Sequence, residues 1–163
     1  MLEEQVLDVR LHDRAAFHCG VPTLDDYLHN YAAQQNAKGL NTVFVMVDDA
    51  QPSKVLGFYT LSAAQIDVQQ LSDSERNKLP RYPVPCFRLG RLARAIEHRG
   101  NGLGEILVGC AVDRCLHARS LVGAYALLVD AIDEKAKSFY MRYGFFPCMD
   151  APLTLYLPLG WSL

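Results

Sequence analysis

A glycine-rich turn at the start of an apolar helix is the feature that most constrains this chain. Three glycines occupy five positions in the segment Arg99-Gly100-Asn101-Gly102-Leu103-Gly104, so the backbone there can approach a ligand closely. The helix that follows presents unpaired N–H groups and the positive end of its dipole, and both attract an anion. Because Arg99 adds a permanent positive charge, the turn predicts a site for a phosphate-bearing cofactor.

Two common kinds of phosphate loop do not fit this turn. A Walker loop requires Lys and then Ser or Thr after its glycines, whereas Gly104 is followed by Glu105. The dinucleotide fingerprint G-x-G-x-x-G requires a wider second spacing, whereas these glycines are each two residues apart. The pattern that remains is Arg-x-x-Gly-x-Gly.

The chain as a whole has the composition of one globular domain, which we expect to span residues 1–163. It has 163 residues, of which 50% are hydrophobic and 21% are charged, and this is ordinary for a soluble protein. The absence of a long apolar run or a signal-peptide pattern predicts a cytoplasmic protein without a membrane anchor. Five dispersed cysteines without a C-x-x-C pair, and five dispersed histidines, predict reduced thiols and no metal site.

Hydrophobic periodicity predicts that strands and helices alternate, which indicates an α/β fold with a mixed central sheet flanked by helices. The turn follows a central strand, and ligands bind at such strand ends in open α/β sheets. The strands are expected at residues 5–10, 42–47, 55–66, 86–95, 125–129 and 153–157, and the helices at 23–39, 72–79, 102–119 and 133–143.

Two further segments form a recognisable set of motifs together with the glycine turn. Leu89-Gly90-Arg91-Leu92-Ala93-Arg94 directly precedes it, and Ser138-Phe139-Tyr140-Met141-Arg142-Tyr143-Gly144-Phe145 follows about 40 residues later. Together the three segments resemble the cofactor strand, pyrophosphate loop and tyrosine helix of the GNAT N-acetyltransferases. The resemblance implies the GNAT acyltransferase fold and an enzyme that uses acetyl-CoA as co-substrate.

The resemblance narrows further to one branch, the GNAT toxins of type II toxin–antitoxin modules (TacT-like and AtaT-like). It implies transfer of an acetyl group to the free α-amino group of aminoacyl-tRNA, which blocks translation. It also implies a ribbon-helix-helix antitoxin that provides the only contact with operator DNA, and a homodimer. The segments that carry it are His18-Cys19-Gly20, Leu24–Leu28, Gly57–Ser62, Leu79–Pro85 and Val129-Asp130-Ala131.

The same resemblance implies roles for individual residues. An N–H group at Leu92 or Ala93 would stabilise charge that develops on the thioester oxygen. The hydroxyl of Tyr140 would protonate the leaving thiolate or donate a hydrogen bond to it. A phenol, with a pKa near 10, gives up a proton less readily than a thiol near 8.5, so full transfer is uphill unless the site shifts one pKa. The implied cofactor-binding residues are Leu92, Ala93, Arg94, Arg99, Gly100, Asn101, Gly102, Leu103, Gly104 and Glu105.

Positive charge is concentrated just before and within these motifs. Residues 76–99 carry seven cations and one acid, although the whole chain has a net charge of −2. A solvated basic surface would explain the segment, but it also fits a polyanionic partner such as tRNA. The cations left over after cofactor binding are Arg76, Lys78, Arg81, Arg88 and Arg91.

The motifs include no obvious general base. Glu97, Glu105 and His98 lie nearby, but such residues are usually exposed. An α-amino group has a pKa of roughly 8, about two units below that of lysine, so part of it is neutral at physiological pH. This favours an α-amine as the acceptor. Two alternatives remain: acetylation of a small-molecule amine or a protein N-terminus, and an acetyl-CoA-binding module without catalytic activity.

Overall fold

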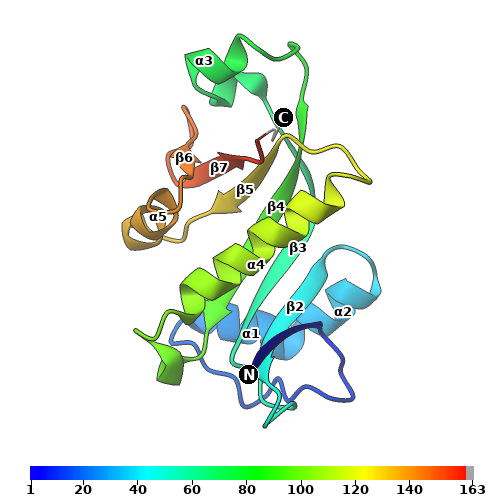
Figure 1. The fold of residues 1–163 in the computed structure, drawn as a ribbon. Coiled ribbons are helices and arrows are strands. Elements are labelled where there is room, and N and C mark those ends of the chain that lie inside the picture. Colours follow the sequence, from blue (N-terminus) through cyan, green and yellow to red (C-terminus); the bar gives the residue numbers. More distant parts are fainter. Residues whose placement is uncertain (161–163) are drawn as a thin grey trace. The chain divides into compact units, whose positions relative to one another are not determined.

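The computed structural model describes residues 1–160 and contains the predicted alternation of strands and helices (Figure 1). The helices are α1 (Pro22–Asn30), α2 (Ala32–Ala37), α3 (Asp73–Arg76), α4 (Leu103–Ala118) and α5 (Glu134–Met141), with 3₁₀ turns η1 (Val68–Gln70) and η2 (Ile96–His98). The strands are β1 (Leu2–Val6), β2 (Thr42–Asp48), β3 (Gly57–Ile66), β4 (Val84–Arg94), β5 (Ala126–Asp130), β6 (Phe146–Pro147) and β7 (Thr154–Pro158).

Within these residues the strands form one mixed sheet in the order β1-β2-β3-β4-β5-β7-β6. The pairs β1/β2, β2/β3, β5/β7 and β6/β7 are antiparallel, whereas β4 pairs with β5 in parallel. The predicted mixed α/β sheet is therefore confirmed, and the strand before the glycine turn is the central one.

Packing divides the chain into two compact units. The first consists of Met1–Ser62 and Gly90–Ala111, and the second consists of residues 63–89 and those from 112 onward. Strands β3 and β4 and helix α4 each contribute residues to both units. The single domain over 1–163 stays a prediction, and its last three residues lie outside the described part of the chain.

In the first unit, helices cover both faces of the sheet. Val43 and Val45 of β2 and Phe58 of β3 share a buried cluster with Tyr27 of α1, as the alternation of side chains along a strand requires. On the opposite face, a Cβ atom at Gly57 would lie 2.8 Å from the side chain of Leu107 in α4. Glycine at this position lets α4 pack directly on β3.

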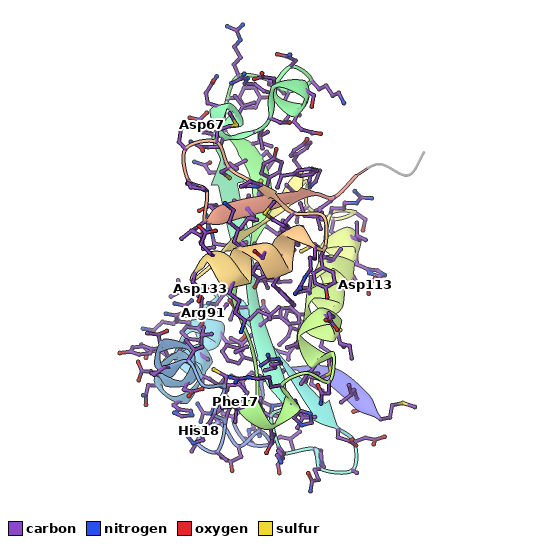
Figure 2. The ribbon with its side chains drawn as sticks, turned by 90° about the vertical axis from the view of Figure 1, so that its left-hand side faces the viewer. Phe17, His18, Asp67, Arg91, Asp113 and Asp133 are labelled. Carbon is purple, nitrogen blue, oxygen red and sulfur yellow. The ribbon has the colours of Figure 1, made fainter. Side chains whose placement is uncertain are left out.

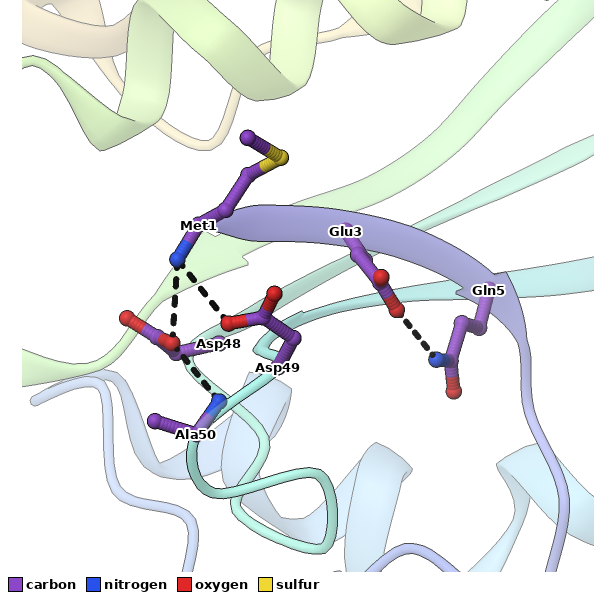
Figure 3. A network of polar contacts seen from close by, with 6 residues as sticks. All are labelled: Met1, Glu3, Gln5, Asp48, Asp49 and Ala50. Carbon is purple, nitrogen blue, oxygen red and sulfur yellow. Dashed lines mark hydrogen bonds and ion pairs between the residues drawn. The ribbon is translucent and has the colours of Figure 1, made fainter.

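The first strand begins earlier than its sequence pattern predicts. It spans Leu2–Val6 rather than 5–10, because Asp8 bends the chain by accepting a hydrogen bond from the Arg10 amide at 2.9 Å. Figure 3 shows the opposite end of this strand, where the N-terminal ammonium group bonds to Asp48 and Asp49 at 3.2 and 3.0 Å.

A buried histidine follows β1. His12 is 4% exposed, and its Nδ1 accepts a hydrogen bond from the Asp8 amide at 2.9 Å. Its Nε2 is 2.9 Å from Oε1 of Gln5, which can only accept, so this nitrogen is the donor. Burial lowers the pKa of His12 from its ordinary value near 6.5, and the neutral ring is the form that fits both bonds.

In the second unit, a separate core lies against β4, β5 and β7. Its buried side chains include Val84, Cys86, Leu128 and Tyr156. Helix α5 begins as predicted at Asp133 (Figure 2), whose side chain caps it by accepting from the Ala136 amide at 2.8 Å.

Candidate active site

The backbone of the glycine turn is left-handed at two of its three glycines. Gly100 and Gly102 have φ angles of +83° and +84°, a region that other residues adopt only with strain. The side chain of Asn101 then accepts a hydrogen bond from the Leu103 amide at 3.3 Å. Helix α4 begins at Leu103, as the turn predicts.

The turn leaves several backbone donors available to a ligand. Within residues 1–160, the N–H groups of Gly100, Gly102, Gly104 and Glu105 have no hydrogen-bond acceptor. A built Cβ atom at Gly100 meets nothing within 4 Å, so the surface over the turn is open. Unpaired amides at the start of a 16-residue helix form an anion-binding site, and this fits the pyrophosphate of acetyl-CoA.

Two arginines stand near this turn. Arg99 is exposed, and its Nη2 atom lies 3.5 Å from the position of a Cβ atom built on Gly20, so the loop after β1 leaves room for it. Arg94, the last residue of β4, is partly buried. Neither guanidinium has a partner among the described residues, so both remain available for phosphate.

The backbone N–H groups of Leu92 and Ala93 on β4, the two candidates for binding the thioester oxygen, point in opposite directions. The Ala93 carbonyl lies 3.0 Å from a Cβ atom built on Gly57 of β3, and the Ala95 amide donates to Leu56 at 2.7 Å. Because successive peptide groups of a strand point to opposite edges, the Leu92 amide is directed away from β3. Of the two, Leu92 is therefore better placed to donate to a ligand.

Tyr140 is buried among aromatic rings in the second unit. It is 7% exposed, and it forms edge-to-face contacts with Phe139 and Phe145 at centroid distances of 5.2 and 5.5 Å. No hydrogen bond is found for its hydroxyl within residues 1–160. Burial raises the pKa of Tyr140 above its ordinary value near 10, so the phenol stays protonated and can act as a donor but not as a base.

The five cations assigned to RNA have different environments. Arg76 pairs with Asp73, and Arg88 pairs with Asp130. Arg91 instead stacks on the ring of Tyr27. Lys78 and Arg81 are exposed and have no partner among the described residues, so these two and Arg91 carry the charge available to a polyanion.

The acids and the histidine near the turn are poor candidates for a general base. Glu97 pairs with Lys54 at 2.9 Å, and this contact lowers the pKa of its carboxyl group. His98 is held by Asn101, whose Nδ2 lies 2.7 Å from the His98 Nδ1. Glu105 is exposed on the first turn of α4.

Sequence reasoning missed one residue of this region. Tyr27 follows the apolar periodicity of α1 and was expected only in the core, but its ring also supports Arg91 of β4. A cation on one element and an aromatic ring on another leave no shared pattern in the sequence. Arg91 lies within the cofactor strand, whose sequence does not indicate an aromatic partner.

Residues 1–160 contain no group of three or more His, Cys, Asp or Glu side chains that could hold a metal ion. No helix in this part of the chain is long and apolar enough to cross a membrane.

Comparisons with known proteins agree with this geometry. No family model matches the chain. The chain is 34% identical over 145 residues to a protein of Mycobacterium tuberculosis (strain ATCC 25618 / H37Rv) described as a tRNA-acetylating toxin, covering 89% of this chain and 85% of the relative.

Solved structures of related toxins also resemble this chain. The toxin AtaT complexed with acetyl-methionyl-tRNAfMet matches with a TM-score of 0.91 and 29% identity, covering 97% of this chain and 95% of that chain. A mutant AtaT bound to the C-terminus of its antitoxin AtaR and to acetyl-CoA matches with a TM-score of 0.83 and 26% identity, covering 97% and 93%. This chain therefore belongs to the family of tRNA-acetylating GNAT toxins.

Proposed function

We propose that this protein is an acetyl-CoA-dependent N-acetyltransferase that acetylates the α-amino group of aminoacyl-tRNA and so blocks translation. The observation that carries the proposal is the open glycine turn, whose unpaired amides and free Arg99 suit a pyrophosphate. The relatives with the same fold include a tRNA-acetylating toxin and an AtaT structure with acetylated tRNA.

The residues of the first unit would hold the co-substrate. Acetyl-CoA supplies the activated acetyl thioester. The unpaired amides of Gly100, Gly102, Gly104 and Glu105, with Arg94 and Arg99, bind its pyrophosphate. The Leu92 amide donates a hydrogen bond to the thioester oxygen as negative charge develops there, and a fixed donor of this kind needs no reorganisation.

As the C–N bond forms and the C–S bond breaks, the acceptor amine loses one proton, which passes to water or to the departing sulfur. An α-amino group with a pKa of roughly 8 is partly neutral at physiological pH, so it can attack without a strong protein base. Tyr140 remains protonated because burial raises its pKa. Its hydroxyl therefore donates a hydrogen bond to the departing sulfur, and the raised pKa favours this role over complete proton transfer.

The proposed partners follow from charge and from the relatives. Lys78, Arg81 and Arg91 supply cations for tRNA phosphates. A ribbon-helix-helix antitoxin would bind the toxin and provide its contact with operator DNA, in line with the AtaT structure that contains AtaR. The homodimer and a cytoplasmic location are part of the same proposal, and sedimentation of the purified toxin tests the first.

The proposal is tested by following labelled acetyl groups. The protein is incubated with labelled acetyl-CoA and one of three acceptors: charged tRNA, the same tRNA after deacylation, or a polyamine. We expect label to enter charged tRNA only, and Tyr140→Phe should reduce its incorporation. Label in the polyamine alone would favour the small-amine alternative, and no turnover with any acceptor would favour the non-catalytic one.

A further inference from the structure

The guanidinium of Arg91 lies over an aromatic ring in the first unit. Its guanidinium carbon lies 3.8 Å from the centroid of the Tyr27 ring, which is within cation–π range. Its backbone amide donates to Oγ1 of Thr60 at 3.1 Å, and Thr60 is 1% exposed. Both the main chain and the charged end of Arg91 therefore have a contact that restricts their movement.

The ring beneath Arg91 is itself fixed. Tyr27 is 4% exposed, and its hydroxyl donates to Oε1 of Gln35 at 2.9 Å. The same hydroxyl accepts from Nδ2 of Asn41 at 2.8 Å, and Asn41 also donates to Gln35 at 3.1 Å. This network uses both the donor and an acceptor site of the hydroxyl, so the ring cannot swing away without breaking hydrogen bonds.

Arg91 lacks a counter-ion, unlike Arg88 on the same strand. Arg88 pairs with Asp130, but no carboxylate within residues 1–160 pairs with Arg91. Its side chain is only partly exposed. A planar guanidinium presents a fork of N–H donors that matches phosphate oxygens, and a stacked, unpaired one is already oriented to receive them.

The position of Arg91 on β4 places it close to the backbone expected to bind the thioester. It lies two residues before Ala93, about 7 Å along the strand at a rise of about 3.3 Å per residue. Its contact with Tyr27 of α1 places it on the sheet face where Ala93 packs in the same cluster as Tyr27. It is therefore the assigned RNA cation nearest in sequence to the backbone expected to bind the thioester.

We propose that Arg91 binds the phosphodiester next to the aminoacylated terminal nucleotide of the RNA, and that Tyr27 is the positioning residue that orients it. The inference rests on the proposed function, because the phosphate belongs to the same acceptor. It deepens that function by assigning recognition of the RNA end to a cation beside the reaction centre, separate from the exposed Lys78 and Arg81.

The test compares two small acceptors that differ by one phosphodiester. One is an amide-linked aminoacyl-adenosine without a phosphate, and the other is the matching aminoacyl cytidylyl-adenosine dinucleotide. Arg91→Gln should raise the KM of the dinucleotide about tenfold or more, since hydrogen bonds to charged groups are strong. Its KM for aminoacyl-adenosine and its acetyl-CoA affinity should match those of the parent.

The matched control is Arg10→Gln. Arg10 is exposed in the same unit, and its guanidinium has no partner among the described residues, so this variant removes the same charge elsewhere. It should leave both KM values unchanged. An equal rise for both acceptors with Arg91→Gln, or no rise for either, would overturn the proposal. A parent that acetylates neither these acceptors nor charged tRNA would refute the proposed function itself.

The role of Tyr27 is tested by two further variants. Tyr27→Leu keeps an apolar side chain but removes the ring, and it should reproduce the dinucleotide-selective rise in KM. Tyr27→Phe keeps the ring and should restore most of the parent's dinucleotide preference. A purely structural role predicts the opposite pattern, in which kcat, acetyl-CoA affinity and both KM values change together, and that result would remove Tyr27 from substrate recognition.

Discussion

Replacing Gly102 by Ala should damage the cofactor turn through the backbone. Gly102 has a φ angle of +84°, where an L-residue costs about 1–2 kcal/mol. The added Cβ atom would lie 3.1 Å from Oε2 of Glu105, but that side chain is exposed and can move. We therefore expect the free energy of unfolding to fall by about 1–2 kcal/mol, nearly all from backbone strain.

The same change should weaken acetyl-CoA binding. A turn that relaxes away from positive φ redirects the amides of Gly102 and Gly104, and the loss of one hydrogen bond to a charged group corresponds to about tenfold or more in affinity. Urea denaturation without ligand measures the stability change, and titration calorimetry measures the affinity.

Gly109→Ala is the matched control for this prediction. Gly109 lies within α4, and a Cβ atom built there meets nothing within 4 Å. Alanine in a helix interior is favoured over glycine by about 0.5–1 kcal/mol, so this variant should be more stable than the parent and bind acetyl-CoA equally well. A Gly102→Ala variant with the stability and affinity of the parent would refute the reasoning.

Three other predictions concern catalysis, RNA binding and acid stability. Tyr140→Phe should keep acetyl-CoA affinity but slow acetylation about 10²–10⁴-fold, the usual effect of losing a positioned proton donor, and calorimetry with steady-state rates checks both. Replacing Lys78 and Arg81 with Glu should raise the KM for charged tRNA and should reduce the slope of log affinity against log salt concentration by about 0.7 per lost contact. Arg76→Glu should raise this KM by less, because Asp73 already neutralises the charge of Arg76. His12 has a lowered pKa in the folded state. Its contribution to stability should therefore be complete above about pH 6.5, its unfolded pKa, and should decline as the pH falls toward the folded pKa. Urea midpoints of the parent and of His12→Asn at pH 5 and 7 test this.

The starts of two helices could be predicted because the residues that determine them are neighbours in the sequence. The glycine turn predicted the start of α4, and Asp133 predicted the start of α5, because capping and positive-φ turns depend on neighbouring residues. The turn's open amides also agree with the predicted anion site, whereas the individual cofactor contacts stay predictions.

Other predicted boundaries of helices and strands were wrong, in one case because two local sequence signals competed. The first helix was expected to start at residue 23, but α1 begins at Pro22 with Val21 as its N-cap, because proline at the first helical position already fixes the backbone. The same helix was expected to continue to Gly39, yet it breaks at Tyr31 into α1 and α2. Strand β6, with two residues, is too short to leave a periodic pattern.

Side-chain partners could not be predicted, because they join elements that are distant in the sequence. The pairing of Arg88 with Asp130 depends on the parallel register of β4 and β5. The stacking of Arg91 on Tyr27 depends on how α1 packs against β4. The charge count alone therefore predicted a uniform basic segment, whereas the structure separates paired cations from available ones.

The identity of the acetylated group tests the central claim most directly. Charged tRNA is incubated with labelled acetyl-CoA and the protein, its aminoacyl ester bond is cleaved by mild alkali, and the labelled product is identified by mass spectrometry. We expect labelled N-acetyl-amino acid, with no label left on the tRNA nucleotides. Label that stays on the nucleotides, or a charged tRNA that takes up none while a small amine is acetylated, would contradict it.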